Sequence, residues 1–532
     1  MRTLETFVRR GGLWAVWMIA ASGQAQTYTF STIAGDPADP GYADGANSSA
    51  LFIEPSGVAV DSLGNLYVAD QYNCVVRKVT RAGANWVVST IAGRPDTYNA
   101  KPPIVNGTNS QALFGYGSPT GVAVDAAGNV YAADQWNNAI RKISPLAGTT
   151  NWVVSTIAGN GVSGSADGTN AAARFYYPTG VAVDARGDLY VADQYNNTIR
   201  KITPVAAAGT TNWVVSTIAG FAGVQGSADG TNANASFYDP SGVAVDTNGN
   251  VYVADQYNNI IRRITPSGTN WVVRTIAGAG PDNPGSKDGT NNSAQFYTPT
   301  GVAVDTSGNV YVADEENDTI RKIAPVGTNW VVSTLGGQAL NSGTNDGVGT
   351  NALFFFPFGL AVDSAGDVYV ADSGNDTIRL GSVSAGLLPQ LIGTTATGRG
   401  FQFILRGPVG SYFTIQASTN LTAWTGLATY VIPAGGSVLI TDPASSEYAH
   451  RFYRPTILVL IPPQLTGMAA SRGAAQFVLN GPAGSNCVIL VSSDLLSWSP
   501  ILTNAIPVGG SILINDPAPA TNGSRFYRAV LP

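Results

Sequence analysis

The chain has 532 residues, of which 44% are hydrophobic and 12% charged, and 62 are glycine. This length and composition exclude a disordered chain and allow two or more packed cores. Many glycines without helical periodicity indicate frequent tight turns, and therefore an all-β fold. Residues 27–390 carry 18 Lys and Arg against 29 Asp and Glu, a net charge of −11, which argues against nucleic acid as a partner.

Residues 1–25 predict a secretory signal peptide. Arginines precede an apolar run from Gly11 to Ala21, and small residues follow it, so cleavage is expected near Gly23 or Ala25. The run is shorter than the roughly 20 apolar residues of a transmembrane helix, and an uncleaved anchor is the weaker alternative. We expect a protein that is secreted, extracellular or at the cell surface, without a transmembrane segment once the leader is removed.

A repeated unit of about 60 residues occupies residues 27–385. Each unit contains the strand-like segments "GVAVD", "LYVAD" and "TIRKI", separated by turn residues, and a fourth segment, "NWVVSTIAG". Four strands in each period fit the blade of a β-propeller. The six copies of the first segment open at Gly57, Gly121, Gly180, Gly242, Gly301 and Gly359.

The order of these segments predicts how the ring closes. The first copy of the fourth segment, "YTFSTIAG", precedes the first "GVAVD", and no such copy follows the last third segment. One blade is therefore split between the two ends of the repeat region. We expect Thr29–Ala34 to pair with Thr377–Gly381 and to close a six-bladed propeller, which removes an open sheet edge.

The six copies share the pattern P-x-G-[VL]-A-V-D-x-x-G-[ND]-x-Y-[VA]-A-D-x-x-N-x-x-I-R, with Val76 in place of the isoleucine once. This pattern resembles the NHL repeat of six-bladed propellers, in a secreted bacterial type, and covers about two thirds of the chain. The resemblance implies the fold. It implies function only loosely, because NHL-like propellers serve as protein-binding modules, RNA-binding domains, sensor domains and occasionally lyases.

A second repeat occupies residues 391–458 and 465–532. Trp424 and Trp498 are 74 residues apart, as are the two "RFYR" motifs. Alternating strands with Pro and Gly turns predict two small β-sandwich modules. They resemble tandem C-terminal modules of secreted bacterial proteins, and we expect them to serve in attachment, spacing or a second contact.

Few residues of the chain suit nucleophilic or metal catalysis. The single histidine, His450, has Ser524 as its counterpart in the second tail copy, which argues against His-dependent catalysis and against the histidine-held zinc of NHL-like amidating lyases. Cys74 and Cys487 lack ligand spacing. We expect Cys74 to replace a turn residue and Cys487 to be buried. No catalytic residue, no metal ligand and no enzyme activity is predicted.

Carboxylates recur at the ends of the first two strands of each unit, and we expect them to accept hydrogen bonds from turn amides. The alternative is a channel calcium of the kind that lactonase-type propellers bind, so calcium is the one cofactor considered and none is expected. The "DGTN" linkers are expected to form Asx turns. The two series are Asp61, Asp125, Asp184, Asp246, Asp305 and Asp363, and Asp70, Asp134, Asp193, Asp255, Asp314 and Asp372.

Tryptophans recur at the start of the fourth strand, which we expect to be the outermost strand of each blade. Inter-blade packing is the favoured interpretation, and a sugar-stacking platform is the alternative. The five residues are Trp86, Trp152, Trp213, Trp271 and Trp330.

The candidate site lies on the face where the second-to-third-strand turns and the interblade linkers emerge together. Amide and aromatic side chains there suit sugars or extended peptides, although the aromatics could instead cover neighbouring blades. The predicted ligand-binding residues are Gln71, Tyr72, Gln135, Trp136, Gln194, Tyr195, Gln256, Tyr257, Glu315 and Glu316, and the sixth blade has Ser373 and Gly374 instead.

The sequence therefore predicts a secreted, non-catalytic, monomeric NHL-repeat propeller that binds an extracellular glycan, peptide or protein. A metal-dependent lactonase-type or lyase-type enzyme and a structural adhesin are the alternatives.

Overall fold

The computed structural model describes residues 27–95, 104–207 and 209–383. In the C-terminal region it describes 390–397, 400–406, 412–419, 423–431, 437–442, 444, 452–457, 464–471, 474–480, 486–492, 499–505, 511–516 and 526–530. The predicted signal peptide and His450 lie outside the described residues. No α-helix occurs within these ranges, and no described helix is long and apolar enough to cross a membrane.

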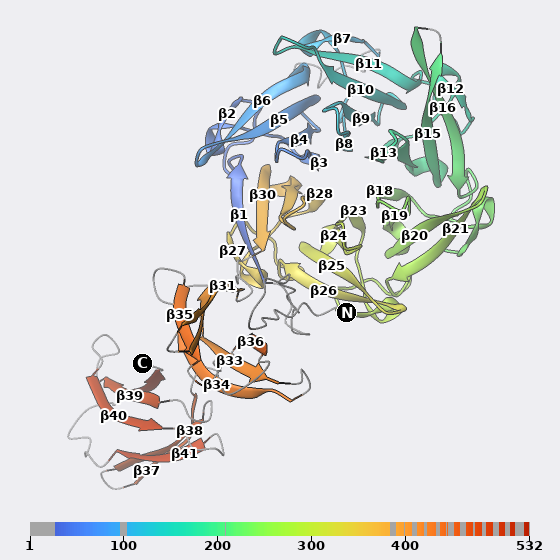
Figure 1. The fold of residues 1–532 in the computed structure, drawn as a ribbon. Coiled ribbons are helices and arrows are strands. Elements are labelled where there is room, and N and C mark those ends of the chain that lie inside the picture. The colour runs from blue at the N-terminus through green and yellow to red at the C-terminus, as the bar shows by residue number, and fades with distance from the viewer. Residues whose placement is uncertain are drawn as a thin grey trace. The chain divides into compact units, whose positions relative to one another are not determined.

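The chain divides into two compact units, Gly23–Ala385 and Gly386–Pro532. In the described part of the first unit, six five-stranded antiparallel sheets surround a common axis as the blades of a propeller (Figure 1). The six-bladed, all-β prediction is therefore confirmed.

The strands of each blade run outward from the axis. Blade 1 contains β3 (Pro55–Val60), β4 (Leu66–Asp70), β5 (Val75–Ala82), β6 (Asn85–Gly93) and β2 (Gly45–Ala46). Blade 2 contains β8 (Val122–Val124), β9 (Val130–Asp134), β10 (Ala139–Pro145), β11 (Trp152–Gly159) and β7 (Gly107–Thr108). Blade 3 contains β13 (Pro178–Val183), β14 (Leu189–Asp193), β15 (Thr198–Ala207), β16 (Thr210–Ala219) and β12 (Gly168–Thr169).

The remaining blades follow the same order. Blade 4 contains β18 (Pro240–Val245), β19 (Val251–Asp255), β20 (Ile260–Ser267), β21 (Asn270–Ala277) and β17 (Gly230–Thr231). Blade 5 contains β23 (Pro299–Val304), β24 (Val310–Asp314), β25 (Thr319–Val326), β26 (Asn329–Gly336) and β22 (Gly289–Thr290). Blade 6 contains β28 (Pro357–Val362), β29 (Val368–Asp372), β30 (Thr377–Val383), β1 (Tyr28–Ala34) and β27 (Gly347–Val348).

Each blade has one strand more than the four predicted. The fifth is a two-residue strand from the "DGTN" linker, and it lies outside the fourth strand, as in the pairs Gly168↔Val215 and Thr169↔Val214. The fourth strand, which carries the tryptophan, is therefore not the outermost. A two-residue strand has too few positions to show alternation, so the sequence pattern does not reveal it.

Closure by the N-terminal strand is confirmed. Strand β1 pairs antiparallel with β30 through Thr29↔Ser382, Phe30↔Gly381 and Thr32↔Arg379. In Figure 1 the blue strand β1 lies beside the orange β30, so the first and last strands of the propeller share one blade.

The hydrophobic core lies between adjacent blades, since each of six buried clusters draws its members from two neighbouring blades. The closing blade fills this space differently from the others. Phe30 is fully buried where other blades carry valine, and a Cβ atom at Gly336 or Gly381 would overlap its ring. These glycines stand where other blades have alanine and isoleucine or valine, so the larger ring replaces the missing side chains and keeps the packing dense.

The tryptophans pack between blades, as favoured from the sequence. Trp152 meets Tyr67 of the preceding blade at 6.1 Å between ring centroids, and Lys78 lies 5.7 Å from each of these rings. Trp86, Trp152 and Trp213 are at most 9% exposed. These rings are inter-blade contacts and not a sugar-stacking platform.

In the second unit, β32 (Gly400–Arg406) pairs with β31 (Gln390–Thr397) and β35 (Ser437–Asp442), and β33 (Tyr412–Ser418) pairs with β34 (Thr425–Val431) and β36 (Phe452–Ile457). One buried cluster, which includes Phe403 and Phe413, draws on both sheets. Two further sheets repeat this order with β37 (Gln464–Ser471), β38 (Ala474–Asn480), β41 (Ser511–Asp516), β40 (Ser499–Ala505), β39 (Asn486–Ser492) and β42 (Phe526–Val530). The sandwich description and the module boundaries stay predictions, and the Cys487 side chain lies outside the described residues.

Candidate functional site

The turns between the second and third strands and the linkers between blades lie on the same face of the propeller, which we call the turn face. The backbone N–H of Tyr195 donates to the Tyr176 carbonyl at 3.1 Å, and that of Tyr257 donates to the Tyr238 carbonyl at 3.2 Å. These bonds tie each turn to the linker that enters its own blade. The turns of blades 3 to 6 are the 3-10 helices η5 (Gln194–Asn196), η7 (Gln256–Asn258), η9 (Glu315–Asn317) and η11 (Ser373–Asn375).

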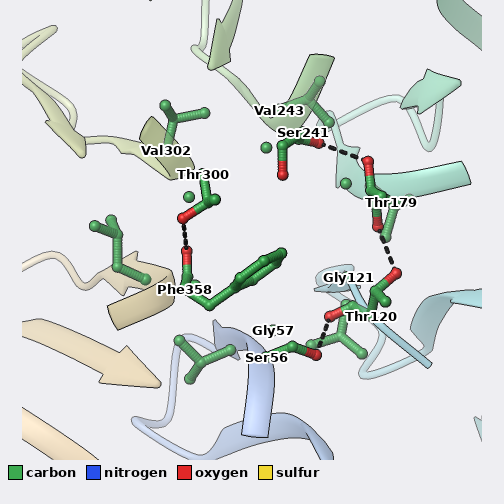
Figure 2. Close-up of a pocket in the computed structure, with 18 residues that line it drawn as sticks. Ser56, Gly57, Thr120, Gly121, Thr179, Ser241, Val243, Thr300, Val302 and Phe358 are labelled. Atoms are coloured by element: carbon green, nitrogen blue, oxygen red, sulfur yellow. Dashed lines mark hydrogen bonds between the residues drawn. The ribbon is translucent and has the colours of Figure 1, made fainter. Parts of the chain in front are cut away.

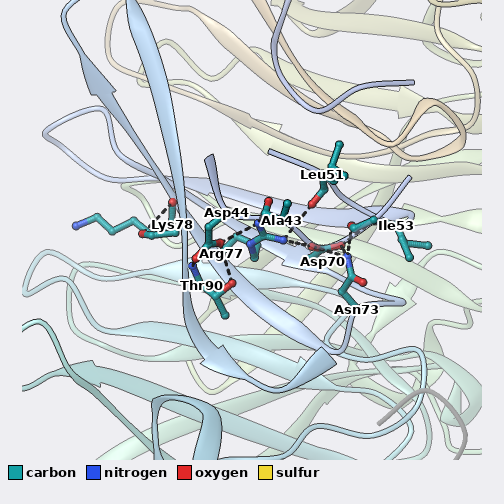
Figure 3. Close-up of polar contacts among 11 residues, drawn as sticks. Ala43, Asp44, Leu51, Ile53, Asp70, Asn73, Arg77, Lys78 and Thr90 are labelled. Carbon is teal, nitrogen blue, oxygen red and sulfur yellow. Dashed lines mark hydrogen bonds and ion pairs between the residues drawn. The ribbon is translucent and has the colours of Figure 1, made fainter. Parts of the chain in front are cut away.

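A buried ion-pair network holds each turn in place. In blade 1, Arg77 donates to the Asp70 carboxylate at 2.6 Å and to the Asp44 carboxylate at 2.9 Å, and Asp70 also accepts from the backbone N–H of Ile53 and the side-chain amide of Asn73 (Figure 3). Burial raises the pKa of Asp70 to about 6 even though these donors favour its ionised form. Because the Arg77 guanidinium bonds both carboxylates, it joins Asp70 at the end of β4 to Asp44 in the linker.

This network corrects part of the expectation for the acidic residues. The Asp70 series bonds a linker amide, an arginine and an asparagine, so its role is structural, as favoured, but through more partners than turn amides. The linker acids pair with arginine and with a threonine of the fourth strand, as Asp44 does with Thr90 at 3.0 Å, and do not serve chiefly in Asx turns. The buried pairs are Asp70–Arg77, Asp134–Arg141, Asp193–Arg200, Asp255–Arg262, Asp314–Arg321 and Asp372–Arg379.

The other acidic series caps the turns of the opposite face, as predicted. Asp61 accepts from the backbone N–H groups of Leu63 and Asn65 at 2.9 Å each, and from the Tyr67 hydroxyl at 3.3 Å. Carboxylates with this many donors are turn caps and have little capacity left for a ligand.

Residues in the left-handed conformation lock neighbouring blades together at the turn face. Asn197 (φ 56°) ends the turn of blade 3 and accepts from the backbone N–H of Asp239 in the blade 4 linker at 2.8 Å. Asp239 is itself left-handed (φ 49°) and precedes a proline, a strained position for a residue with a side chain. The equivalent residues of other linkers are Glu54, Tyr177, Thr298 and Phe356.

The sequence prediction missed these five pre-proline positions. They share one backbone conformation, but each carries a different side chain on the turn face. No local pattern reveals them, because the backbone N–H of each is capped by an Asn or Asp side chain that ends the turn of the preceding blade, as Asp376 caps Glu54. Blade 2 is the exception. Cys74 is buried and takes the left-handed conformation (φ 57°), in agreement with its prediction as a substituted turn residue, and the Ser118 hydroxyl of the altered linker accepts from the Trp136 backbone N–H at 3.0 Å.

The predicted glutamines come together in a row on the turn face. The side-chain amide of Gln135 donates to Gln194 at 3.4 Å, and that of Gln194 donates to Gln256 at 3.4 Å. Gln71 holds the same repeat position in blade 1 and Glu315 in blade 5. In blade 6, the Ser373 hydroxyl donates to the Pro55 carbonyl at 2.5 Å, so that blade presents no long side chain there.

The predicted aromatic residues join linker residues in a continuous series, which we call the aromatic arc. Successive ring centroids are 6.0, 5.9, 5.5 and 4.7 Å apart from Tyr72 to Tyr195, and the last two rings are stacked. Tyr195 and Tyr257 are 43% and 45% exposed, whereas Tyr72 and Trp136 are half-buried. Two of the predicted aromatics therefore cover a neighbouring linker and two face solvent, and their role in ligand binding stays a prediction. The series of ring contacts comprises Tyr72, Tyr116, Trp136, Tyr177 and Tyr195, and we add to the arc Tyr257 of the next blade, whose ring contacts Tyr238 at 5.2 Å.

Acidic groups gather at the blade 5 end of the arc. Burial, followed by the charges of Glu316 and Asp318, raises the pKa of Glu315 to about 8. Among the described residues, none donates a hydrogen bond to the Glu315 carboxylate or forms an ion pair with it. Burial, followed by Asp239 and less strongly by Glu315, raises the pKa of Tyr257, which belongs to the blade preceding that of Glu315. We call Glu315, Glu316 and Asp318 the acidic sector.

The central channel is narrow and occupied by protein groups. The Ser56 hydroxyl donates to the Thr120 carbonyl at 2.9 Å, the Thr120 hydroxyl continues the series to the next blade, and the Phe358 ring points toward the axis where other blades carry Ser or Thr (Figure 2). The remaining cavity of about 60 Å³ has room for only a few waters. No carboxylate is among the residues that line it, unlike the calcium site of the lactonase-type alternative.

The inner glycines explain why the channel is narrow. A Cβ atom at Gly180 would overlap the Ser241 carbonyl oxygen of the next blade, and the same holds around the ring. Only glycine permits this approach of neighbouring inner strands. Within the described residues there is also no group of three or more His, Cys, Asp or Glu side chains arranged to hold a metal ion.

Comparison with known proteins supports the propeller type. The NHL repeat model matches residues 52–78, 175–202, 237–262 and 296–323, which lie in blades 1, 3, 4 and 5. Four NHL repeats within six five-stranded blades fit an NHL-repeat β-propeller. A structural genomics protein of unknown function from Bacteroides thetaiotaomicron is similar in fold, with a TM-score of 0.50 and 19% identity over 72% of this chain and 90% of its own.

Two curated relatives are similar in sequence. Protein SUPPRESSOR OF QUENCHING 1, chloroplastic, from Arabidopsis thaliana is 30% identical over 299 residues, or 54% of this chain and 26% of its own length. NHL repeat-containing protein 2 from Homo sapiens is 28% identical over 312 residues, or 53% of this chain and 40% of its own length. The similarity therefore spans about a quarter and two fifths of these relatives.

Proposed function

We propose that this protein is a secreted, non-catalytic NHL-type propeller that binds an extracellular glycan, peptide or protein through its turn face. The observation that carries the proposal is the aromatic arc, with the glutamine row beside it. Tyrosine and tryptophan offer large contact area at low entropic cost, and the amides fix orientation by hydrogen bonds. The narrow channel directs the proposal to this face, because a cavity of about 60 Å³ has no room for such a ligand.

The two parts of the arc contribute differently. Tyr195 and Tyr257 stand exposed and are available as contact surface, while Tyr72 and Trp136 pack against Tyr116 and keep the arc rigid. Covering two exposed rings removes roughly 100 Å² of apolar surface from water, worth about 2.5 kcal/mol at 25 cal/mol per Å². Loss of both rings should therefore weaken binding by at least tenfold.

The proposed place of action is outside the cytoplasm. The charged, apolar and small segments of residues 1–25 support export, and the C-terminal modules are proposed to serve in attachment, spacing or a second contact. A monomer is the proposed state. Mass spectrometry of the mature N-terminus from a secreting host would test export, since cleavage near Gly23 or Ala25 is expected.

The binding test uses glycan arrays and pull-down of extracellular surface proteins with the whole protein. Tyr195→Ala combined with Tyr257→Ala should abolish captured signals without changing the unfolding temperature, because both side chains are exposed. The larger set with Tyr72 and Trp136 also changed should lose binding with some loss of stability. Leu63→Ala on the opposite face is the control and should bind as wild type. Normal binding by the double variant would overturn the assignment of the face.

A further inference from the structure

We propose that the ligand is an extended peptide segment whose Lys or Arg side chain enters the acidic sector while its neighbours lie on the aromatic arc. This inference rests on the proposed binding function of the turn face and adds the chemical class of the ligand. It stands on two features together: exposed aromatic surface and a complementary charge at one end of it.

The acidic sector is formed by groups of one sign. Glu315 and Glu316 begin the turn of blade 5 and Asp318 ends it, and burial, followed by the charges of Glu316 and Asp318, raises the pKa of Glu315. Within the described residues no Lys or Arg pairs with Glu315 or Glu316. A cation brought by a ligand would relieve this repulsion.

The sector is one blade away from the exposed end of the arc. Gln194 and Gln256 hold the same repeat position in successive blades, and their side chains are hydrogen-bonded at 3.4 Å. Glu315 holds this position in the next blade, and Tyr257 directly follows Gln256. The exposed Tyr257 ring therefore belongs to the blade next to the carboxylates. Ammonium and guanidinium groups bind favourably over aromatic faces, and Arg also pairs with carboxylates.

A basic peptide fits these features better than a neutral glycan. Desolvating a carboxylate against an uncharged ligand costs free energy, whereas an ion pair offsets that cost. Extended peptides dock on aromatic-lined surfaces in known recognition modes. The region 27–390, at a net charge of −11, would also attract a basic partner at long range.

Other blades show which uncharged residues the fold accepts at the Glu315 and Asp318 positions. Four other blades carry Gln at the Glu315 position, and three carry Asn at the Asp318 position. Asn still caps the next linker there, as Asn197 does for Asp239. Glu315→Gln with Asp318→Asn therefore gives blade 5 the uncharged Gln and Asn that blades 2, 3 and 4 carry at these positions. On the opposite face, Asp367→Asn is the matched control, because other blades have Asn there.

The test selects peptides from a random dodecamer phage library on the immobilised whole protein at pH 8. Selected peptides should be enriched in Lys and Arg over the unselected library. One selected peptide, made synthetically, should bind the Glu315→Gln/Asp318→Asn variant at least fivefold more weakly than wild type. It should bind Asp367→Asn less than twofold more weakly than wild type. Its affinity should also fall as salt is raised.

The outcomes separate the two proposals. The basic-peptide inference is overturned if the selected peptides are not enriched in Lys and Arg, or if they bind the Glu315→Gln/Asp318→Asn variant as tightly as wild type. Either result leaves the proposed binding function in place. The basic-peptide inference is likewise overturned if no peptide is selected while a neutral glycan on the array binds through Tyr195 and Tyr257. If no peptide and no array or surface ligand depends on these tyrosines, both proposals fail. Circular dichroism checks that each variant folds.

Discussion

The Glu315 carboxyl offers a direct test of the electrostatics of the turn face. Its pKa in the folded protein is raised to about 8, against an ordinary value of about 4.3 for glutamate in an unfolded chain. The native state therefore holds the proton more tightly than the unfolded state. Stability from this group is complete below the unfolded pKa and is lost as the pH rises through about 8.

Glu315→Gln should remove this loss, because glutamine carries no titrating proton. Each pKa unit corresponds to about 1.4 kcal/mol, so a carboxyl fully out of water would lose about 5 kcal/mol. Glu315 retains some contact with solvent, and we expect about 2 kcal/mol between pH 5 and pH 9.

The assay is thermal unfolding of wild type and Glu315→Gln across this pH range, taken as the difference between the two proteins so that other titrating groups cancel. The variant should match wild type near pH 5 and unfold about 3 °C higher at pH 9. A difference that stays constant with pH, or that favours wild type at pH 9, would refute the assigned burial and repulsion.

Three further outcomes follow from the fold. Arg200→Met leaves a buried carboxylate without its partner and should cost about 3–5 kcal/mol in guanidinium unfolding, whereas Arg186→Met, at an exposed pair, should cost under about 0.5 kcal/mol. Phe30→Val should cost about 2–4 kcal/mol, and Gly381→Ile should recover part of that loss in the double variant, so strictly additive effects would contradict the packing at the closure. Deleting residues 391–532 should leave the cooperative unfolding transition of the propeller in place, and its disappearance would show a shared core.

The fold could be read from the sequence because its strongest signals are local and repeated. Alternating residues, Gly and Pro punctuation, and the displaced copy of the fourth strand were enough to predict six blades and their closure by Thr29–Ala34. The fifth strand was missed because two residues carry no period. The narrowing of the channel was also missed, although the sequence shows Phe358 where other blades carry Ser or Thr.

The site was predictable in its composition but not in its geometry. The glutamine and aromatic positions fall at fixed offsets in each repeat, so their common face follows from propeller topology. Exposure does not follow from topology, because Tyr72 and Trp136 depend on a linker tyrosine that differs between blades. The left-handed pre-proline residues, such as Glu54, depend on a side-chain cap from the preceding blade, which is a long-range contact.

Departures from sixfold symmetry fall into two groups that respond to different constraints. In most of them a neighbouring residue compensates for the change: Phe30 fills the space at Gly336 and Gly381, and on the turn face Cys74 accompanies an altered linker at Ser118. Dense packing leaves no other option, since an uncompensated change would open a cavity or a clash. Ser373, which replaces glutamine in blade 6, likewise donates to the Pro55 carbonyl. Glu315 differs from these, because it replaces glutamine with no described cation beside it. Packing does not account for that substitution, and the proposed basic ligand would.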